Sequence, residues 1–321
     1  SFALRYEDYG DGIGDTTNPK LALLWQPMDS LAFRASGSSS FRAPSVHQLQ
    51  GAQTNFTNIT DPVDGSSTFG GNRTIGDPNL KPETSTAFNI GASIAAGDWD
   101  IDVDYWRFSF EDVLTRENAQ QIVDQYWDDP DVETRNSRIE RTQAGTITIV
   151  NTFFINANAI DTSGVDFSAK TDYDTTLGSF SPSFDATYIL AYDVEDNTGN
   201  VIDGAGSLNR DNIGNPTPEL RANAGLRWSH KQHSANIFYR YVDSYTNDQN
   251  NDSIDAFGTI DLQYSLGLGD FLRSGSATTL TIGLLNAADE APPFVAISGS
   301  YDPRVGDPRG RRAYIRVGAN F

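Results

Sequence analysis

The last eleven residues, Arg311-Arg312-Ala313-Tyr314-Ile315-Arg316-Val317-Gly318-Ala319-Asn320-Phe321, decide the fold class. Polar or small residues alternate here with apolar residues that share one face, namely Ala313, Ile315, Val317, Ala319 and Phe321. A period of two is typical of a strand with one apolar face. In a soluble sandwich that face would meet a core. In a membrane barrel it would meet lipid, and the polar face would line a wet interior.

The same alternation recurs in earlier segments, among them 83–95, 157–173, 218–229 and 255–267. Charged residues stand at strand centres on the polar faces: Asp102, Asp104, Arg221, Arg227 and Asp261. Alternation alone does not separate a sandwich from a barrel. Within 98–111 the phase slips after Tyr105, since Trp106, Phe108 and Phe110 are then the large residues, and a β-bulge is one explanation.

The connections separate the two architectures. About 12 strands are predicted, over residues 1–6, 20–26, 30–39, 83–95, 98–111, 157–173, 179–193, 218–229, 233–245, 255–267, 276–286 and 311–321. Short turns alternate with long connections at about 7–19, 40–82, 112–156, 194–217, 246–254 and 287–310. Outer-membrane barrels place short turns in the periplasm and long loops outside the cell. We therefore predict an all-β, antiparallel, up-and-down transmembrane barrel with these long connections as extracellular loops.

Composition agrees with this class. Hydrophobic residues make up 38% of the 321 residues, and no uninterrupted apolar run reaches the roughly 18 residues that a membrane helix needs. A barrel strand needs only about 9–11 residues with one apolar face. The formal charge of -20 and the absence of a basic stripe argue against a nucleic-acid partner. The chain has no cysteine, so disulfides and thiolate metal sites are excluded.

Several motifs go beyond pattern. Ser40-Phe41-Arg42-Ala43-Pro44-Ser45 is followed by Asp77-Pro78-Asn79-Leu80-Lys81-Pro82-Glu83-Thr84-Ser85, and later by Gly164-Val165-Asp166-Phe167 and by Leu285-Asn286-Ala287-Ala288-Asp289. Together with the closing strand, this ordered set resembles the TonB-dependent outer-membrane receptors over about residues 30–321.

The resemblance implies a barrel of about 22 strands around an N-terminal plug, of which residues 1–321 are the C-terminal part. The implied function is uptake of a scarce nutrient across the outer membrane of a Gram-negative bacterium, such as siderophore-bound iron, cobalamin or an oligosaccharide. The implied partners are the missing plug and first strands, the TonB energy-coupling protein that acts through the plug, the barrel assembly machinery, and outer-membrane lipids with lipopolysaccharide. No enzymatic activity and no cofactor are implied.

Other functions stay open at this stage. An autotransporter translocator closes with about 12 strands, but it needs a helix through its pore, and we expect none before Ser1. Another porin-like channel, an outer-membrane enzyme and a soluble carbohydrate-binding sandwich are further alternatives. No G-x-S-x-G element is present and the three histidines fall in predicted loops or turns, so no catalytic set and no metal site are expected.

Candidate ligand contacts come from the predicted extracellular loops: His47, Arg73, Arg116, Tyr126 and Trp127. The acidic surroundings of Tyr126 and Trp127 could bind calcium or stack on a sugar, but the segment lacks the glycine and glutamate of a calcium loop. Packing within the loop is the simpler alternative for His47, and a solvated acidic loop for the Tyr126 segment.

By resemblance, the terminal aromatic Phe321 is part of the signal that the barrel assembly machinery reads. We expect Phe321→Ala, or a short C-terminal extension, to lower the amount of inserted barrel without changing the ligand affinity of the protein that does insert. Quantifying folded protein in outer-membrane fractions tests this, and normal membrane levels of the variant would contradict it.

Overall fold

Twelve strands joined by eleven antiparallel ladders form one continuous sheet, called the wall below. The computed structural model describes residues 1–10, 14–129, 132–195, 200–210, 215–269, 277–297 and 299–320, so Phe321 lies outside the described residues. Across the wall the strands are β1 (Phe2–Asp8), β2 (Asp15–Met28), β3 (Leu31–Arg42), β6 (Glu83–Ala96), β7 (Trp99–Arg116), β9 (Ile147–Thr171), β11 (Gly178–Glu195), β13 (Leu220–His230), β14 (His233–Val242), β17 (Phe257–Gly269), β18 (Ala277–Leu285) and β19 (Arg312–Asn320). Each predicted strand has a counterpart, which confirms the predicted all-β antiparallel architecture.

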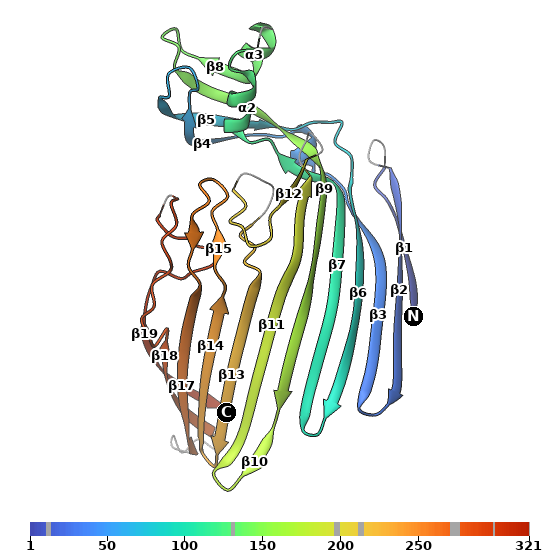
Figure 1. Cartoon of the computed structure of the whole chain (residues 1–321), viewed down its shortest axis with the longest axis vertical. Helices are drawn as coiled ribbons and strands as arrows, with labels where there is room; N and C mark the ends of the chain where they lie inside the picture. The colour runs from blue at the N-terminus through green and yellow to red at the C-terminus, as the bar shows by residue number, and fades with distance from the viewer. Residues whose placement is uncertain are drawn as a thin grey trace.

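The two ends of the wall differ (Figure 1). Tight turns such as Gly97-Asp98 and Lys231-Gln232 join strands at the lower end, and the positive φ of Gly97, 64°, suits its turn. The long connections gather at the upper end. Figure 1 places β1 and β19 at opposite margins, and in the part of the chain that the structure describes no ladder joins them. The described wall is therefore an open sheet with two free edges.

The wall has two chemically distinct faces. One row of cross-strand partners, from β3 to β13, is polar or small: Arg34, Gly91, Asp104, Asp166, Thr187 and Arg221. The adjacent row, one residue along each strand, is apolar: Phe33, Ala92, Val103, Phe167, Ala186 and Ala222. Because successive side chains of a strand point to opposite faces, the two rows define a polar face and an apolar face.

Large side chains of the apolar face stay exposed. They form a belt that crosses the wall and includes Leu23, Trp25, Phe33, Ile90, Val103, Phe184, Leu226, Ile237, Ile260, Leu262, Ile282, Ile315 and Val317. Soluble monomers rarely expose a continuous apolar patch of this extent. The belt therefore needs a cover other than water, as the lipid-facing band of an outer-membrane barrel does.

The predicted β-bulge after Tyr105 is wrong. The β6–β7 ladder runs without interruption from Thr84 opposite Glu111 to Ala96 opposite Trp99. Trp106, Phe108 and Phe110 therefore share the polar face with Asp104, and successive ring centroids lie 5.6 Å and 6.4 Å apart. The change of phase in the sequence marks where the polar face becomes aromatic toward the upper end.

Two of the expected loops, 40–82 and 112–156, contain regular structure. The first holds α1 (Val46–Gln50), β4 (Ala52–Thr60) and β5 (Ser67–Ile75), and the second holds α2 (Ala119–Tyr126), α3 (Val132–Arg138) and β8 (Ile139–Arg141). The wall strand β9 continues upward, where its residues 149–153 pair in parallel with β5 and its first residues pair with β8. We call β4, β5, α2, α3, β8 and this part of β9 the upper subdomain (Figure 1).

The upper subdomain has its own apolar core, made of Ile59, Ala119, Ile122, Val123, Ile139, Ile147 and Val150. Asn118 accepts hydrogen bonds from the backbone of Gln120 and Gln121 and thereby begins α2. Shorter elements complete the upper and lower connections: β10 (Tyr173–Thr175), β12 (Val201–Asp203), β15 (Tyr245–Thr246) and β16 (Ser253–Ile254). None of the helices among the described residues is long and apolar enough to cross a membrane.

Adjacent residues of β6 test the two faces. Ile90 lies on the apolar face and is 49% exposed, whereas Asn89 lies on the polar face opposite Ser36 and Trp106. We expect Ile90→Lys to reduce the free energy of unfolding in lipid vesicles by about 2–4 kcal/mol, because a lysine would enter the hydrocarbon. The matched variant Asn89→Lys should fold nearly as the native protein does. Urea titrations in phosphatidylcholine vesicles measure both, and equal losses would contradict this assignment of faces.

Candidate functional site

The five predicted ligand contacts lie in or beside the upper subdomain. His47 on α1 and Arg116 at the end of β7 meet on the buried ring of Phe154. The centroids of the His47 and Phe154 rings lie 5.7 Å apart, edge to face, and the Arg116 guanidinium carbon lies 5.4 Å from the Phe154 centroid. The two residues thus pack where the wall meets the upper subdomain.

The other three residues are distributed within the subdomain. Arg73 on β5 donates to Glu140 Oε1 at 3.0 Å and to Asn151 Oδ1 at 3.4 Å. Tyr126 packs against the apolar core, while Trp127, which follows α2, is 37% exposed. Trp127 is therefore the most open of the three, and a ligand-binding role for any of the five stays a prediction.

Arg138 joins the elements of the upper subdomain. It donates to Glu117 Oε2 at 2.6 Å, and its guanidinium carbon lies 5.2 Å from the Tyr126 centroid and 4.9 Å from that of Phe153. The same Glu117 oxygen accepts the backbone N–H of Phe153 at 2.8 Å. A half-buried ion pair therefore holds α3 against β9 and α2. Sequence reasoning missed it because these residues share no local spacing.

The charges on the polar face of the wall are distributed unevenly. Its acidic half, on β7, β9 and β11, carries Asp100, Asp102, Asp104, Asp166 and Asp185, with Lys170 opposite Asp100. Arg34 on β3 neutralises part of it, since it donates to Asp102 at 3.0 Å and makes two hydrogen bonds to Asp104. A Cβ at Gly91 would overlap the Asp104 carboxylate, so the glycine leaves room for this ion pair.

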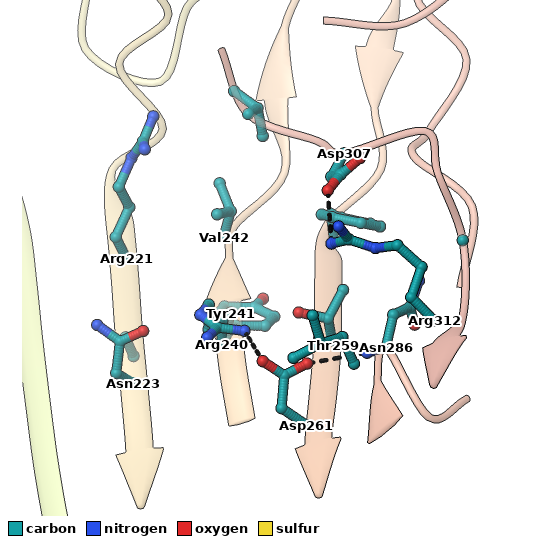
Figure 2. Close-up of a pocket in the computed structure, with 15 residues that line it drawn as sticks. Arg221, Asn223, Arg240, Tyr241, Val242, Thr259, Asp261, Asn286, Asp307 and Arg312 are labelled. Carbon is teal, nitrogen blue, oxygen red and sulfur yellow. Dashed lines mark hydrogen bonds and ion pairs between the residues drawn. The ribbon is translucent and has the colours of Figure 1, made fainter. Parts of the chain in front are cut away.

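The basic half carries Arg221 and Arg227 on β13, Arg240 on β14, and Arg312 and Arg316 on β19. Asp261 on β17 lies on the same polar face as these arginines. Its carboxylate accepts hydrogen bonds from Arg240 at 2.6 Å and from the backbone N–H of Asn286 at 2.8 Å. At the upper end of this half, the connection after β18 folds over the strands. Together with the upper ends of β13, β14, β17 and β19, it borders an open cavity of about 510 Å³ (Figure 2).

Asp307 closes one side of this cavity. It accepts hydrogen bonds from Arg309 at 2.8 Å, 3.0 Å and 2.7 Å, and from Arg312 at 3.0 Å. The hydrogen bonds from Arg309, ahead of the attraction of Arg309 and Arg312, hold the pKa of the Asp307 carboxyl well below its usual range. Asp307 is therefore ionised throughout the neutral range, but two guanidinium groups share its single charge.

Sequence reasoning identified part of this site. Arg221, Arg227 and Asp261 are strand-centre charges in the sequence, and the structure places Arg221 and Asp261 in the cavity wall. The residues that cover the cavity, among them Val305 and Asp307, fall in the predicted loop 287–310, where no periodic signal predicts position. Among the described residues, no cluster of three or more metal-ligating side chains occurs.

Comparisons with known proteins agree with this architecture. The family model described as TonB dependent receptor-like, beta-barrel matches residues 1–287. Curated proteins gave no match. A variant of the ferric enterobactin receptor PfeA from Pseudomonas aeruginosa, in complex with enterobactin, aligns with a TM-score of 0.65 and 16% identity, over 98% of this chain and 42% of its own.

Two further solved structures align similarly. The siderophore receptor PirA from Acinetobacter baumannii has a TM-score of 0.63 and 14% identity, over 96% of this chain and 41% of its own. The FrpB iron transporter from Neisseria meningitidis has a TM-score of 0.57 and 15% identity, over 95% and 39%. At these identities the likeness shows the fold alone, and this chain spans only 39% to 42% of the length of these three proteins.

Arg138 offers a test of the upper subdomain. We expect Arg138→Leu to destabilise it by about 3 kcal/mol, because the change leaves the half-buried Glu117 carboxylate without its cation. Limited proteolysis should then cut within 117–153 faster, while the thermal transition of the wall stays unchanged. Arg135→Leu, on the same helix, is the matched control because Arg135 has no ion pair among the described residues. Equal protease resistance of native protein and Arg138→Leu would contradict the role of this ion pair.

Proposed function

Since the chain belongs to the TonB-dependent receptor family, in its β-barrel part, we propose that it is the C-terminal portion of the wall of an outer-membrane receptor. The whole protein captures a scarce nutrient at the cell surface and moves it inward with energy supplied from the inner membrane. Its chemistry is binding and gating, without bond breaking.

The observation that carries this proposal is the two-sided wall. The exposed apolar belt suits lipid, and the charged polar face suits a hydrated interior. The alternation of tight lower turns with long upper connections supports an orientation with the lower end in the periplasm and the upper end outside the cell. In that orientation the upper subdomain and the cavity meet incoming ligand first.

The free edges of β1 and β19 support the presence of further strands. Unpaired backbone N–H and C=O groups in hydrocarbon cost several kcal/mol each, so a membrane barrel must close. The alignment with PfeA covers 98% of this chain but only 42% of the PfeA chain. We infer that the rest of the receptor supplies the remaining strands, the plug that fills the interior, and the segment that meets TonB. A self-contained barrel of about 12 strands fits this open sheet less well.

The proposed nutrient is suggested by the solved structures that this fold resembles. The printed names of the similar structures are a ferric enterobactin receptor, a siderophore receptor and an iron transporter. We propose siderophore-bound iron as the first substrate to test, with cobalamin and oligosaccharides as the other classes that this architecture could serve.

Uptake in a Gram-negative strain that lacks its own iron receptors tests the proposal. We expect the whole protein to restore growth under iron limitation with at least one member of a panel of ferric siderophores, and deletion of the TonB energy-coupling protein to abolish that growth. Cells that lack TonB but express a siderophore-permeable porin are the control for intact inner-membrane transport. Growth that persists without TonB would contradict energised uptake and indicate a passive channel.

A further inference from the structure

We infer that the cavity between the connection 286–311 and the upper ends of β13, β14, β17 and β19 binds a small molecule with at least two oxyanion groups, such as a polycarboxylate. Arg221 and Arg312 are its main contacts. The inference deepens the proposed uptake function and rests on it, because it names a charge class for the ligand. Figure 2 shows Arg221 at one side of the cavity and Arg312 at the other, with Arg240 and Asp261 between them.

Arg221 is the first unneutralised cation. It lies on the polar face of β13, and its one described hydrogen bond reaches the Pro216 carbonyl oxygen at 3.5 Å, the limit for such a bond. No carboxylate among the described residues forms an ion pair with it. Its planar guanidinium therefore keeps donors free for a carboxylate or phosphate, which it can bind with two parallel hydrogen bonds.

Arg312 is the second cation of the cavity, and it is only partly neutralised. Its Nη2 donates to Asp307 at 3.0 Å, but Asp307 is more closely engaged by Arg309. The Nε of Arg312 is buried and has no hydrogen-bond partner among the described residues. The Arg312 side chain as a whole is 40% exposed, and Asp307 engages only its Nη2, so other N–H donors of the guanidinium can meet a ligand oxygen in the cavity.

The remaining charges do not cancel these cations. Asp261 is already engaged by Arg240 and by the backbone of Asn286. The cavity lining thus holds three arginines against two aspartates, one of which also neutralises Arg309 outside the lining. This excess of positive charge stands in a chain whose formal charge is -20. Within so acidic a protein, a local surplus of guanidinium groups favours anions in this cavity.

The cover of the cavity is held by its own packing. Leu208, Tyr245, Ile254 and Val295 form a small buried core in the upper connections, against which Val305 packs. The Tyr245 hydroxyl donates to Asp302 at 3.3 Å, and Asp302 accepts the backbone N–H of Arg304 at 3.0 Å. The site therefore exists before ligand binds, and its volume of about 510 Å³ is within the usual range for small-molecule sites.

Calorimetric titration of the purified whole protein in detergent, without an energy source, tests the inference. The probes are tricarballylate as a tricarboxylate, inorganic phosphate as a single oxyanion, and trehalose as a neutral molecule. We expect tricarballylate to bind, phosphate to bind at least about tenfold more weakly, and trehalose not to bind. Arg221→Gln and Arg312→Gln should each weaken tricarballylate binding by about 10-fold to 100-fold.

Arg227→Gln is the matched control, because Arg227 shares the strand and the face of Arg221 but does not line the cavity. Its affinity should stay within about twofold of native. Heat-modified mobility on gels verifies that each variant is folded. Arg221→Lys keeps the positive charge but lacks the paired N–H donors of the guanidinium, so its tricarballylate affinity should lie between those of the native protein and Arg221→Gln. Absent tricarballylate binding, equal binding of phosphate, or an equal loss in Arg227→Gln would each overturn the inference. None of these outcomes affects TonB-dependent growth, so failure here is distinct from failure of the proposed function.

Discussion

Inside a bilayer each backbone N–H and C=O must find a partner within the protein, since the hydrocarbon offers none. A long antiparallel sheet meets this constraint between its strands, and the remaining features of this chain follow from it. Strand pairing fixes a side-chain period of two, which turns one row of residues to lipid and the next row inward. The rows that begin at Phe33 and at Arg34 are the direct expression of this rule across six strands.

The same constraint explains which parts of the fold were predictable. The wall strands alternate strongly because one face must be apolar, so each was located to within a few residues, except that β2, β7 and β9 extend at their upper ends beyond the predicted ranges. The upper subdomain could not be predicted in this way. The segment Ala52–Thr60 shows no apolar alternation, because its large apolar residues Phe56 and Ile59 are three positions apart and only Ile59 is buried. The core around Ile59 comes from residues that lie between Ala119 and Val150 in the sequence. The phase change at Trp106 was misread because a polar face can also carry aromatic residues.

The candidate site divides similarly. Charged residues such as Arg221 and Asp261 stand on the polar side of the alternation in their strands, so the sequence itself predicts that they share the polar face of the wall. Their partners were not visible, because Asp307 and Val305 reach the cavity from a connection whose path depends on a small core around Tyr245. The candidate site lies where the regular wall meets an irregular connection, and sequence periodicity carries little information there.

The central claim is that the wall separates lipid from a hydrated interior, and scanning spin labels along β17 tests it most directly. The chain has no cysteine, so single cysteines between Gly258 and Leu266 can be labelled without background. In lipid vesicles, we predict that labels at Ile260, Leu262 and Tyr264 collide mainly with oxygen, and that labels at Thr259, Asp261 and Gln263 collide mainly with a water-soluble nickel chelate. Equal accessibility to the nickel chelate at all positions would contradict a membrane wall.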